Sequence, residues 1–373
     1  MQFLGSYYNP NKTQLFFVPS FKWFNNYDKL GLGVSLYNQV IPKQGYYFKI
    51  NPIYSFGMDN ISGNFTFGYK YFPSESTSQV FDSFIYSSNL ERFGFNNDYY
   101  YNKYYDHLHM DFNNQDKNSF KHKSIDIRLL VINEEYIGDG VTPFELKKNQ
   151  IFSDITFNFD YDHPINSYDY ELSLNFGPEF IRTDLVSSLS VFNPIKISKF
   201  NSKIHFRLFA SIFLKNNDSN YPLNLRYGSS ADYLYDYDFL GRSESTGLLS
   251  QHIVLEQGGF KDIDNITNVI TGDFMISCNT LFPLIYTKSK LLPDISTYLD
   301  FAFIPNPITP PWNDGQSSSV YYSFGLSIPV GALQFYIPIY NKNGFNNFND
   351  LFGALSYSIR LPNIEIADML GLN

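Results

Sequence analysis

The stretch from Ile61 to Tyr71 reads ISGNFTFGYKY and alternates apolar or aromatic residues with small or polar ones. Successive side chains of a β-strand point to opposite faces, so this alternation produces one apolar face and one polar face. A helix would instead need apolar residues three or four positions apart. The stretch therefore predicts an amphipathic β-strand.

The same alternation recurs along the chain. It is clear at 155–161 and 168–176, which the short segment Asp162–Ser167 joins into a predicted hairpin. Further candidate strands lie near Phe16 and at 30–37, 48–56, 125–133, 204–214, 274–281, 295–303, 320–328, 333–339 and 355–361, with less regular ones at 81–86 and 185–191. We predict an all-β, antiparallel fold of about 12 strands, within a range of 12–14.

Composition narrows the class of protein. Aromatic residues make up 19% of the chain and outnumber the charged ones at 17%, and the net charge is −9. No basic surface for nucleic acid is expected from this balance. The single cysteine, Cys278, excludes an intramolecular disulfide. The first residues lack the basic and apolar regions of a signal peptide, and no run approaches the roughly 18 apolar residues of a membrane-spanning helix.

Alternation alone does not distinguish a soluble β-sandwich from a transmembrane β-barrel, because both have one apolar face. Three features favour the barrel. Aromatic residues gather at strand ends, as in Tyr46-Tyr47-Phe48 and Tyr69-Lys70-Tyr71-Phe72, where interfacial girdles would lie. Polar and charged residues occupy the opposite face well inside the strands. Short turns alternate with long polar loops, which we place at 89–120, 216–271 and 305–319 on one side of the membrane.

We therefore predict a single outer-membrane β-barrel domain over residues 1–373, located in the bacterial outer membrane and in contact with its lipid. The predicted lipid-facing residues are Phe65, Phe67, Tyr69, Phe157, Phe159, Leu172, Leu174, Leu333, Phe335 and Ile337. The predicted lumen-facing residues are Asn64, Lys70, Asp154, Asn158, Asp160, Asp169, Glu171, Asn175, His205, Arg207, Gln334 and Arg360. Such polar side chains are costly in hydrocarbon but are tolerated in water or when paired.

The segment 216–271 is predicted to be a long loop or a plug that folds into the lumen. It contains a stretch rich in Tyr, Gly, Arg and Glu, in which Arg242 or Glu244 would bond to lumen charges. A barrel of about twelve strands is wider than its own side chains fill, so its lumen would be partly occupied. We expect a closed or weakly conducting pore.

Asp106-His107-Leu108-His109-Met110-Asp111 is the strongest motif for metal binding, because histidines at i and i+2 of a strand share a face. The pair could bind a transition metal with a flanking carboxylate, but the motif lies in a predicted long polar loop with no further ligand in sight, so we interpret His107 and His109 as part of a solvated loop. The chain contains no H-E-x-x-H, G-x-S-x-G, P-loop or G-x-G-x-x-G motif. We expect no cofactor, no metal site and no catalytic residue.

Three groups of short stretches carry a family resemblance. They are Leu240-Gly241-Arg242-Ser243-Glu244 with Leu248-Leu249-Ser250-Gln251 and Gly258-Gly259-Phe260-Lys261, Gly31–Asn38 with Asn51–Gly57, and Leu326–Val330 with Phe335–Ile339. Together they resemble the C-terminal region of large Bacteroidota proteins whose N-terminal part is an aminopeptidase N-like (gluzincin) zinc metallopeptidase. The zinc ligands of that family belong to the peptidase part, which this chain lacks.

The resemblance implies a non-catalytic, porin-like barrel that serves as a membrane anchor or a passage for an associated periplasmic or surface peptidase unit. Two alternatives remain open. One is a surface protein that binds glycans or other ligands, with Tyr99–Tyr101 and Tyr233–Tyr237 in aromatic loops that stack on sugars. The other is a barrel-type hydrolase with an unrecognised acid/base set or a metal at His107 and His109.

Overall fold

The computed structural model describes most of the predicted strands and parts of their connections. The described residues are 2–3, 15–23, 26–38, 45–74, 80–96, 99–114, 119–134, 149–193, 203–217, 224–226, 228, 234, 236, 247–261, 270–285, 295–307, 319–341 and 348–359. Contacts group the chain into two compact units, one of residues 1–158 with 175–178 and one of residues 159–174 with 179–373. The prediction of a single domain stays a prediction.

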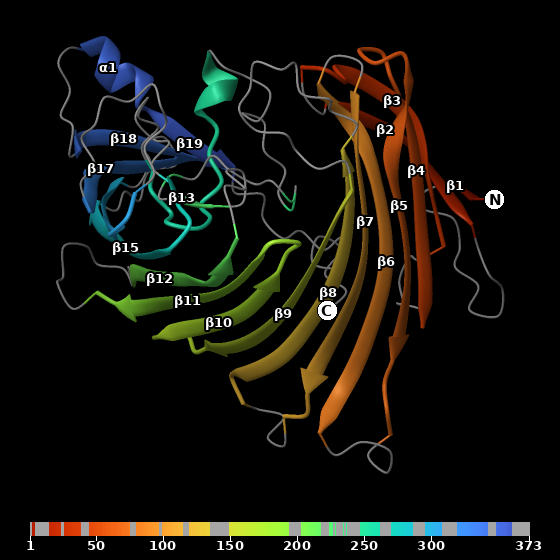
Figure 1. Ribbon diagram of the computed structural model, residues 1–373, viewed down its shortest axis with the longest axis horizontal. Coiled ribbons are helices and arrows are strands. Elements are labelled where there is room, and N and C mark those ends of the chain that lie inside the picture. The colour runs from red at the N-terminus through yellow and green to blue at the C-terminus, as the bar shows by residue number, and fades with distance from the viewer. Residues whose placement is uncertain are drawn as a thin grey trace. The chain divides into compact units, whose positions relative to one another are not determined.

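Unit 1 is an antiparallel meander in which each strand from β2 to β8 pairs with the next along the chain (Figure 1). Its strands are β1 (Gln2–Phe3), β2 (Phe16–Trp23), β3 (Leu30–Tyr37), β4 (Tyr46–Ser55), β5 (Asn60–Tyr71), β6 (Phe81–Asn96), β7 (Tyr99–Phe112), β8 (Lys121–Glu134) and most of β9 (Asn149–Asp162). The short strand β1 pairs with β2 in parallel.

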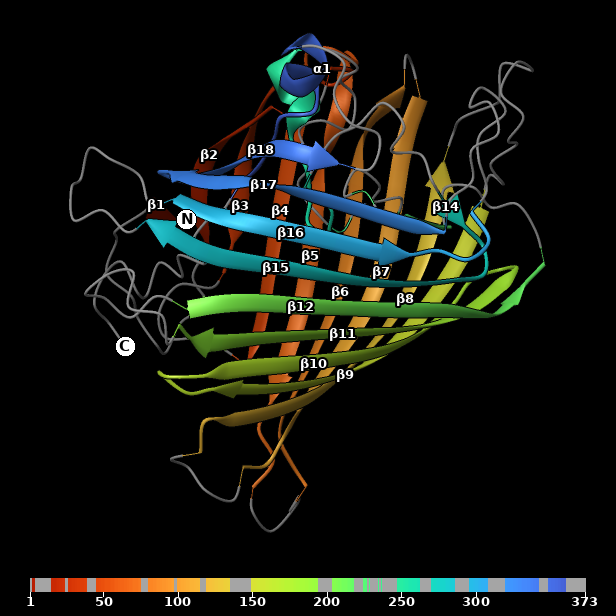
Figure 2. The ribbon, with the colours of Figure 1, turned by 90° about the vertical axis from the view of Figure 1, so that its left-hand side faces the viewer.

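Unit 2 continues with the end of β9 and most of β10 (Ser167–Phe176), followed by a second antiparallel meander in which β11, β12, β15, β16, β17, β18 and β19 pair in that order. Figure 2 shows β12 and β15–β18 side by side. These strands are β11 (Phe180–Phe192), β12 (Lys203–Asn216), β15 (Phe274–Ile285), β16 (Ile295–Phe303), β17 (Val320–Val330), β18 (Leu333–Asn341) and β19 (Ser356–Ile359). The shorter elements are β13 (Leu225–Arg226), β14 (Ile270–Thr271), the 3₁₀ helix η3 (Leu248–Gln251) and α1 (Phe348–Gly353).

One face of these strands is apolar and exposed. In β5, Phe65, Phe67 and Tyr69 are 37%, 40% and 50% exposed, whereas Ser62 between the apolar positions is buried. The same alternation continues across both units, at Leu90, Tyr104, Ile127, Leu129, Ile151, Ile155, Phe157, Leu172, Leu185, Leu189, Phe206, Leu208, Ile212, Ile276, Leu299, Phe301 and Phe324. A soluble protein of this size rarely exposes so extended an apolar surface.

The opposite face carries the buried polar residues of the strands. Its buried polar residues include Asn51, Ser55, Ser62, Ser87, Asn89, Lys103, Asp154, Asp184, Ser211, Asn279, Asp300, Ser327 and Gln334. Many of them bond to one another across strands, as when Ser35 Oγ donates to Asn51 Oδ1 at 2.9 Å. The strands therefore have an apolar exposed face and a polar buried face, the reverse of a soluble sheet.

Asp106 on β7 interrupts the apolar face of unit 1. Its carboxylate accepts a hydrogen bond from Tyr86 Oη on β6 at 2.7 Å and bonds from Tyr104 Oη at 3.0 Å to each oxygen. The charge on this face is thus met by two phenol donors.

The prediction of an all-β antiparallel fold is confirmed, but the predicted strand number is wrong. The described ranges contain sixteen strands of four or more residues, where we predicted about 12. The main error lies in 89–120, predicted as a long loop, which forms the second half of β6 and all of β7. Tyr100 and Tyr101 are accordingly buried strand residues, 6% and 0% exposed, and do not belong to an aromatic loop.

The predicted lipid-facing residues lie on the described strands, and their contact with lipid stays a prediction. Phe65, Phe67, Phe157 and Leu172 are exposed, and Phe159, Leu174 and Phe335 are partly exposed. Within the ranges given above, no helix is both long and apolar enough to span a membrane.

Candidate functional site

A buried ionic network lies on the polar face of unit 2. Lys261 Nζ donates to Asp300 Oδ1 at 2.5 Å, and the backbone N–H of Lys261 donates to the other carboxylate oxygen at 3.0 Å. Asn279 Nδ2 donates to the same Oδ1 at 3.1 Å. Asp300 is therefore a fully buried carboxylate whose charge is met by one cation and further hydrogen bonds, as a buried charge requires.

Arg207 extends this network from β12. Its Nη1 donates to the carbonyl of Gln257 at 2.8 Å and to Asn279 Oδ1 at 3.2 Å. Asn279 Nδ2 also donates to the carbonyl of Gly258 at 3.0 Å. Side chains of three adjacent strands, β12, β15 and β16, thus bind the backbone of residues 257–261.

We call residues 247–261 the covering segment, because it lies against the polar face of these strands. Gly259 adopts a φ of +69°, and a Cβ there would lie 2.6 Å from Asn279 Oδ1 and 2.8 Å from Arg207 Nη1. Only glycine allows this turn to approach the two side chains so closely. At its other end, His252 forms an isolated bridge with Tyr357 of β19, and Ile253 N–H donates to the Tyr357 carbonyl at 2.8 Å.

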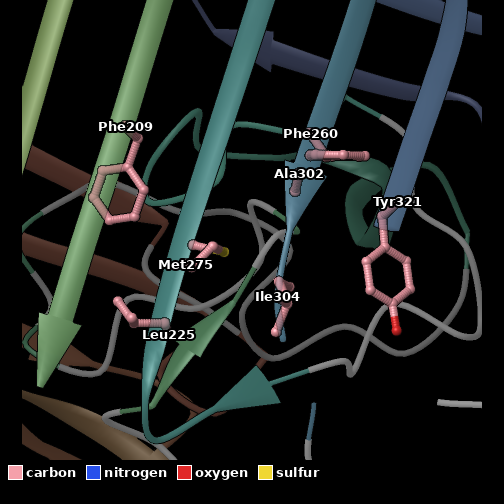
Figure 3. Packing of buried hydrophobic residues seen from close by; sticks show 7 residues of the cluster. All are labelled: Phe209, Leu225, Phe260, Met275, Ala302, Ile304 and Tyr321. Carbon is pink, nitrogen blue, oxygen red and sulfur yellow. The ribbon is translucent and has the colours of Figure 1, made fainter. Parts of the chain in front are cut away.

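Apolar contacts fix the same segment in place. Phe260 packs with Leu225 of β13 against residues of four strands (Figure 3), in a cluster formed by Phe209, Leu225, Phe260, Met275, Ala302, Ile304 and Tyr321. A second cluster joins Ile253 to Tyr298 of β16 and Tyr336 of β18. Ile253 and Phe260 are 2% and 1% exposed, so the covering segment is anchored at both ends by buried side chains.

The predicted lumen residues have different surroundings in the structure. Arg207 lies in the network, whereas His205 lies near the strand end, with its Nδ1 2.7 Å from Ser190 Oγ. Asp160 on β9 and Glu171 on β10 are exposed. Arg242, Glu244 and Arg360 lie outside the described residues, so the predicted bonds of Arg242 and Glu244 stay predictions.

Asn279 and Asp300 were not singled out from the sequence, and Lys261 was named only as the last residue of the motif at 258–261. A local signal exists for Asp300, which stands between Leu299 and Phe301 in a regularly alternating strand and so had to face away from the apolar side. Nothing local indicates that Lys261, 39 residues earlier, is its partner.

A second polar cluster lies on unit 1. His107 and His109 do not belong to a solvated loop, as predicted, but to β7, where both point to its polar face. Asp126 of the paired strand β8 lies opposite His109 in register. Its Oδ1 is 2.7 Å from His107 Nε2 and 2.7 Å from His109 Nδ1. The carboxylate that meets both histidines therefore comes from the neighbouring strand.

Other side chains surround these three. His109 Nε2 lies 2.9 Å from Asp111 Oδ1, and His122 Nε2 lies 2.9 Å from the same oxygen. Asn158 of β9 donates its Nδ2 hydrogen to Asp126 Oδ2 at 2.6 Å. Strands β7, β8 and β9 thus contribute to one cluster.

No protein-family model and no curated protein matches the sequence. Solved structures with some similarity include BamA from Haemophilus ducreyi lacking POTRA domains 1–3, with 14% identity, a TM-score of 0.44, and coverage of 87% of this chain and 66% of that one. CdiB from Acinetobacter baumannii has 9% identity, a TM-score of 0.39, and coverage of 90% and 58%. CdiB from Escherichia coli has 10% identity, a TM-score of 0.41, and coverage of 91% and 61%. The chain spans less than two thirds of the length of each.

Proposed function

We propose that the chain is a non-catalytic β-barrel of the bacterial outer membrane that serves as a membrane anchor or a passage for an associated metallopeptidase-like unit. The membrane location is supported by the reversed polarity of the strands. Their apolar and aromatic residues are exposed, and their polar residues are buried. Strands β4–β12 are 10–16 residues long, enough for tilted strands to cross a hydrocarbon core.

Anchoring is favoured over open passage by the covering segment. Its backbone is held by Arg207, Asn279 and Asp300, and its side chains fill two apolar clusters. A segment fixed in this way on the polar face would obstruct a lumen. The association with a peptidase rests on the sequence resemblance alone.

Folding in detergent tests the membrane part. We expect the purified chain to require detergent or lipid and to migrate differently on a gel before and after heating, as a folded barrel does. A monodisperse monomer in detergent-free buffer would contradict the proposal.

Conductance recordings in planar bilayers distinguish a membrane anchor from an open passage. The intact chain should conduct weakly or not at all, and deletion of residues 233–261 should increase conductance stepwise. A large stable conductance of the intact chain would favour an open passage instead.

The peptidase association calls for a different experiment. The reading frame directly upstream should encode a gluzincin-like unit, and that unit should co-purify with this chain. Zinc-dependent peptide hydrolysis by the purified chain alone would overturn the non-catalytic assignment.

A further inference from the structure

We infer that His107, His109 and Asp126 form a binding site for a divalent transition-metal ion, and we take Zn²⁺ as the reference ion. The three ligand atoms, His107 Nε2, His109 Nδ1 and Asp126 Oδ1, all lie within 4.8 Å of one another. Imidazole nitrogens with a carboxylate oxygen are a donor set that zinc, copper and nickel bind well. Three protein ligands leave a fourth position for water or another molecule.

The strand pairing produces this arrangement. His107 and His109 are two residues apart on β7 and share a face, and Asp126 lies opposite His109 on β8. The ring centroids of His107 and His109 are 6.3 Å apart, and the two rings meet edge to face. Ligands of a tetrahedral zinc ion are about 3.3 Å apart, given Zn–N bonds of about 2.0–2.1 Å. The two nitrogens now 2.7 Å from Asp126 Oδ1 therefore need only a small outward movement to admit the ion.

The surrounding side chains are those that a metal site needs around its ligands. While His109 Nδ1 binds the ion, its Nε2–H can donate to Asp111 Oδ1, now 2.9 Å away. A carboxylate bonded to the far nitrogen orients a ligating imidazole and increases its basicity. Asn158 in turn fixes Asp126 through its second oxygen at 2.6 Å.

The charge of the nearby Arg128 and the exposure of the three ligands are both compatible with a bound cation. Arg128 follows on the same face of β8, but its Nε donates to Asp154 of β9 at 2.8 Å, so its charge is balanced there. The side chains of His107, His109 and Asp126 are 34%, 25% and 20% exposed, so an ion can reach them from the polar face. This site is separate from the network around Asp300 and does not depend on the peptidase association.

Metal titration of the full chain, folded in detergent, tests the inference. We expect one Zn²⁺ per chain by calorimetry, and a Co²⁺ complex whose visible absorption indicates four- or five-coordination. The double variant His107→Gln/His109→Gln and the single variant Asp126→Asn should each lose at least tenfold in affinity. His205→Gln is the matched control, because it removes a strand histidine outside the cluster and should leave affinity unchanged.

Asp111→Asn keeps all three ligands and addresses the possibility that a ligand variant fails to fold. It should weaken binding about 10- to 100-fold while heat-modifiable gel mobility and far-ultraviolet circular dichroism remain those of the parent chain. Equal zinc affinity in the parent chain and the folded double variant would overturn the site. A loss of zinc affinity in His205→Gln as large as that in the double variant would also overturn the site. Either result would place the bound metal elsewhere.

Discussion

Lys261 Nζ lies 2.5 Å from Asp300 Oδ1, and the two side chains are only 7% and 0% exposed. The covering segment is thus tied to β16 by a charge pair from which water is excluded. Removing one partner of such a pair leaves an uncompensated charge in a poorly solvated place.

The first prediction concerns this pair. Lys261→Met should lower the free energy of unfolding by about 3–5 kcal/mol, because Asp300 would lose its cation in a place where burial disfavours the charged carboxylate. The double variant Lys261→Met/Asp300→Leu should recover part of this loss. Urea unfolding in lipid vesicles measures both variants. Values for Lys261→Met within experimental error of the parent chain would show that the pair is unimportant.

The second prediction concerns the turn at Gly259. Gly259→Ala introduces a left-handed alanine and a Cβ that meets Asn279 and Arg207. We expect a loss of about 1–3 kcal/mol and faster proteolysis within the covering segment. The control is Gly331→Ala, where φ is +61° and nothing lies within 4 Å of a Cβ. If both variants lose the same stability, the contact with Arg207 and Asn279 adds nothing beyond backbone strain.

The third prediction tests the apolar face directly. Phe157→Arg should cost about 2–4 kcal/mol if position 157 lies near the bilayer midplane, because the guanidinium would face hydrocarbon. Thr156→Arg is the matched control on the adjacent position of β9, which faces the polar side between Asp154 and Asn158. Unfolding from vesicles measures the difference, and an equal cost at both positions would contradict the proposed lipid face.

The fourth prediction is a pH dependence at His252. Burial lowers the pKa of this imidazole below its usual value, and the side chain lies in the covering segment outside the long strands. Near and below the usual imidazole pKa, the unfolded chain therefore binds more protons than the folded one. The contribution of His252 to stability is present above about pH 6.5 and is lost as the pH falls below that value.

The measurement is the free energy of unfolding of the parent chain and of His252→Gln between pH 8 and pH 5. We expect the parent chain to lose more stability on acidification than the variant does. A parallel loss in both chains would show that other groups cause the pH dependence.

The sequence predicted the strands whose faces differ clearly in polarity, such as β5, β9 and β10. It missed β7 because Asn102-Lys103-Tyr104-Tyr105-Asp106 places polar and aromatic residues on both faces, so no apolar period is visible. Strand β7 is recognised as a strand only through its pairing with β6 and β8.

The same limit applies to the sites. His107 and His109 were recognisable as a pair because they stand two residues apart in the sequence, whereas Asp126 becomes their neighbour only through the register of β7 and β8. Asp300 and Lys261 likewise meet through the path of the covering segment. Local patterns report which face a side chain occupies, but partners from other strands depend on long-range pairing.

The carboxylate of Asp106 has a consequence for assembly in the bilayer proposed above. Its phenol partner Tyr86 lies on β6, where Ser88 is directly opposite Asp106. If β6 and β7 paired two residues out of register so that Tyr86 lay opposite Met110, Tyr86 would move away from the charge and its hydrogen bond would be lost on a surface proposed to face hydrocarbon. Tyr104 lies on the same strand as Asp106 and would keep its own bonds, so we expect a hairpin misaligned in this direction to carry a less well-satisfied charge on its lipid face than the native one.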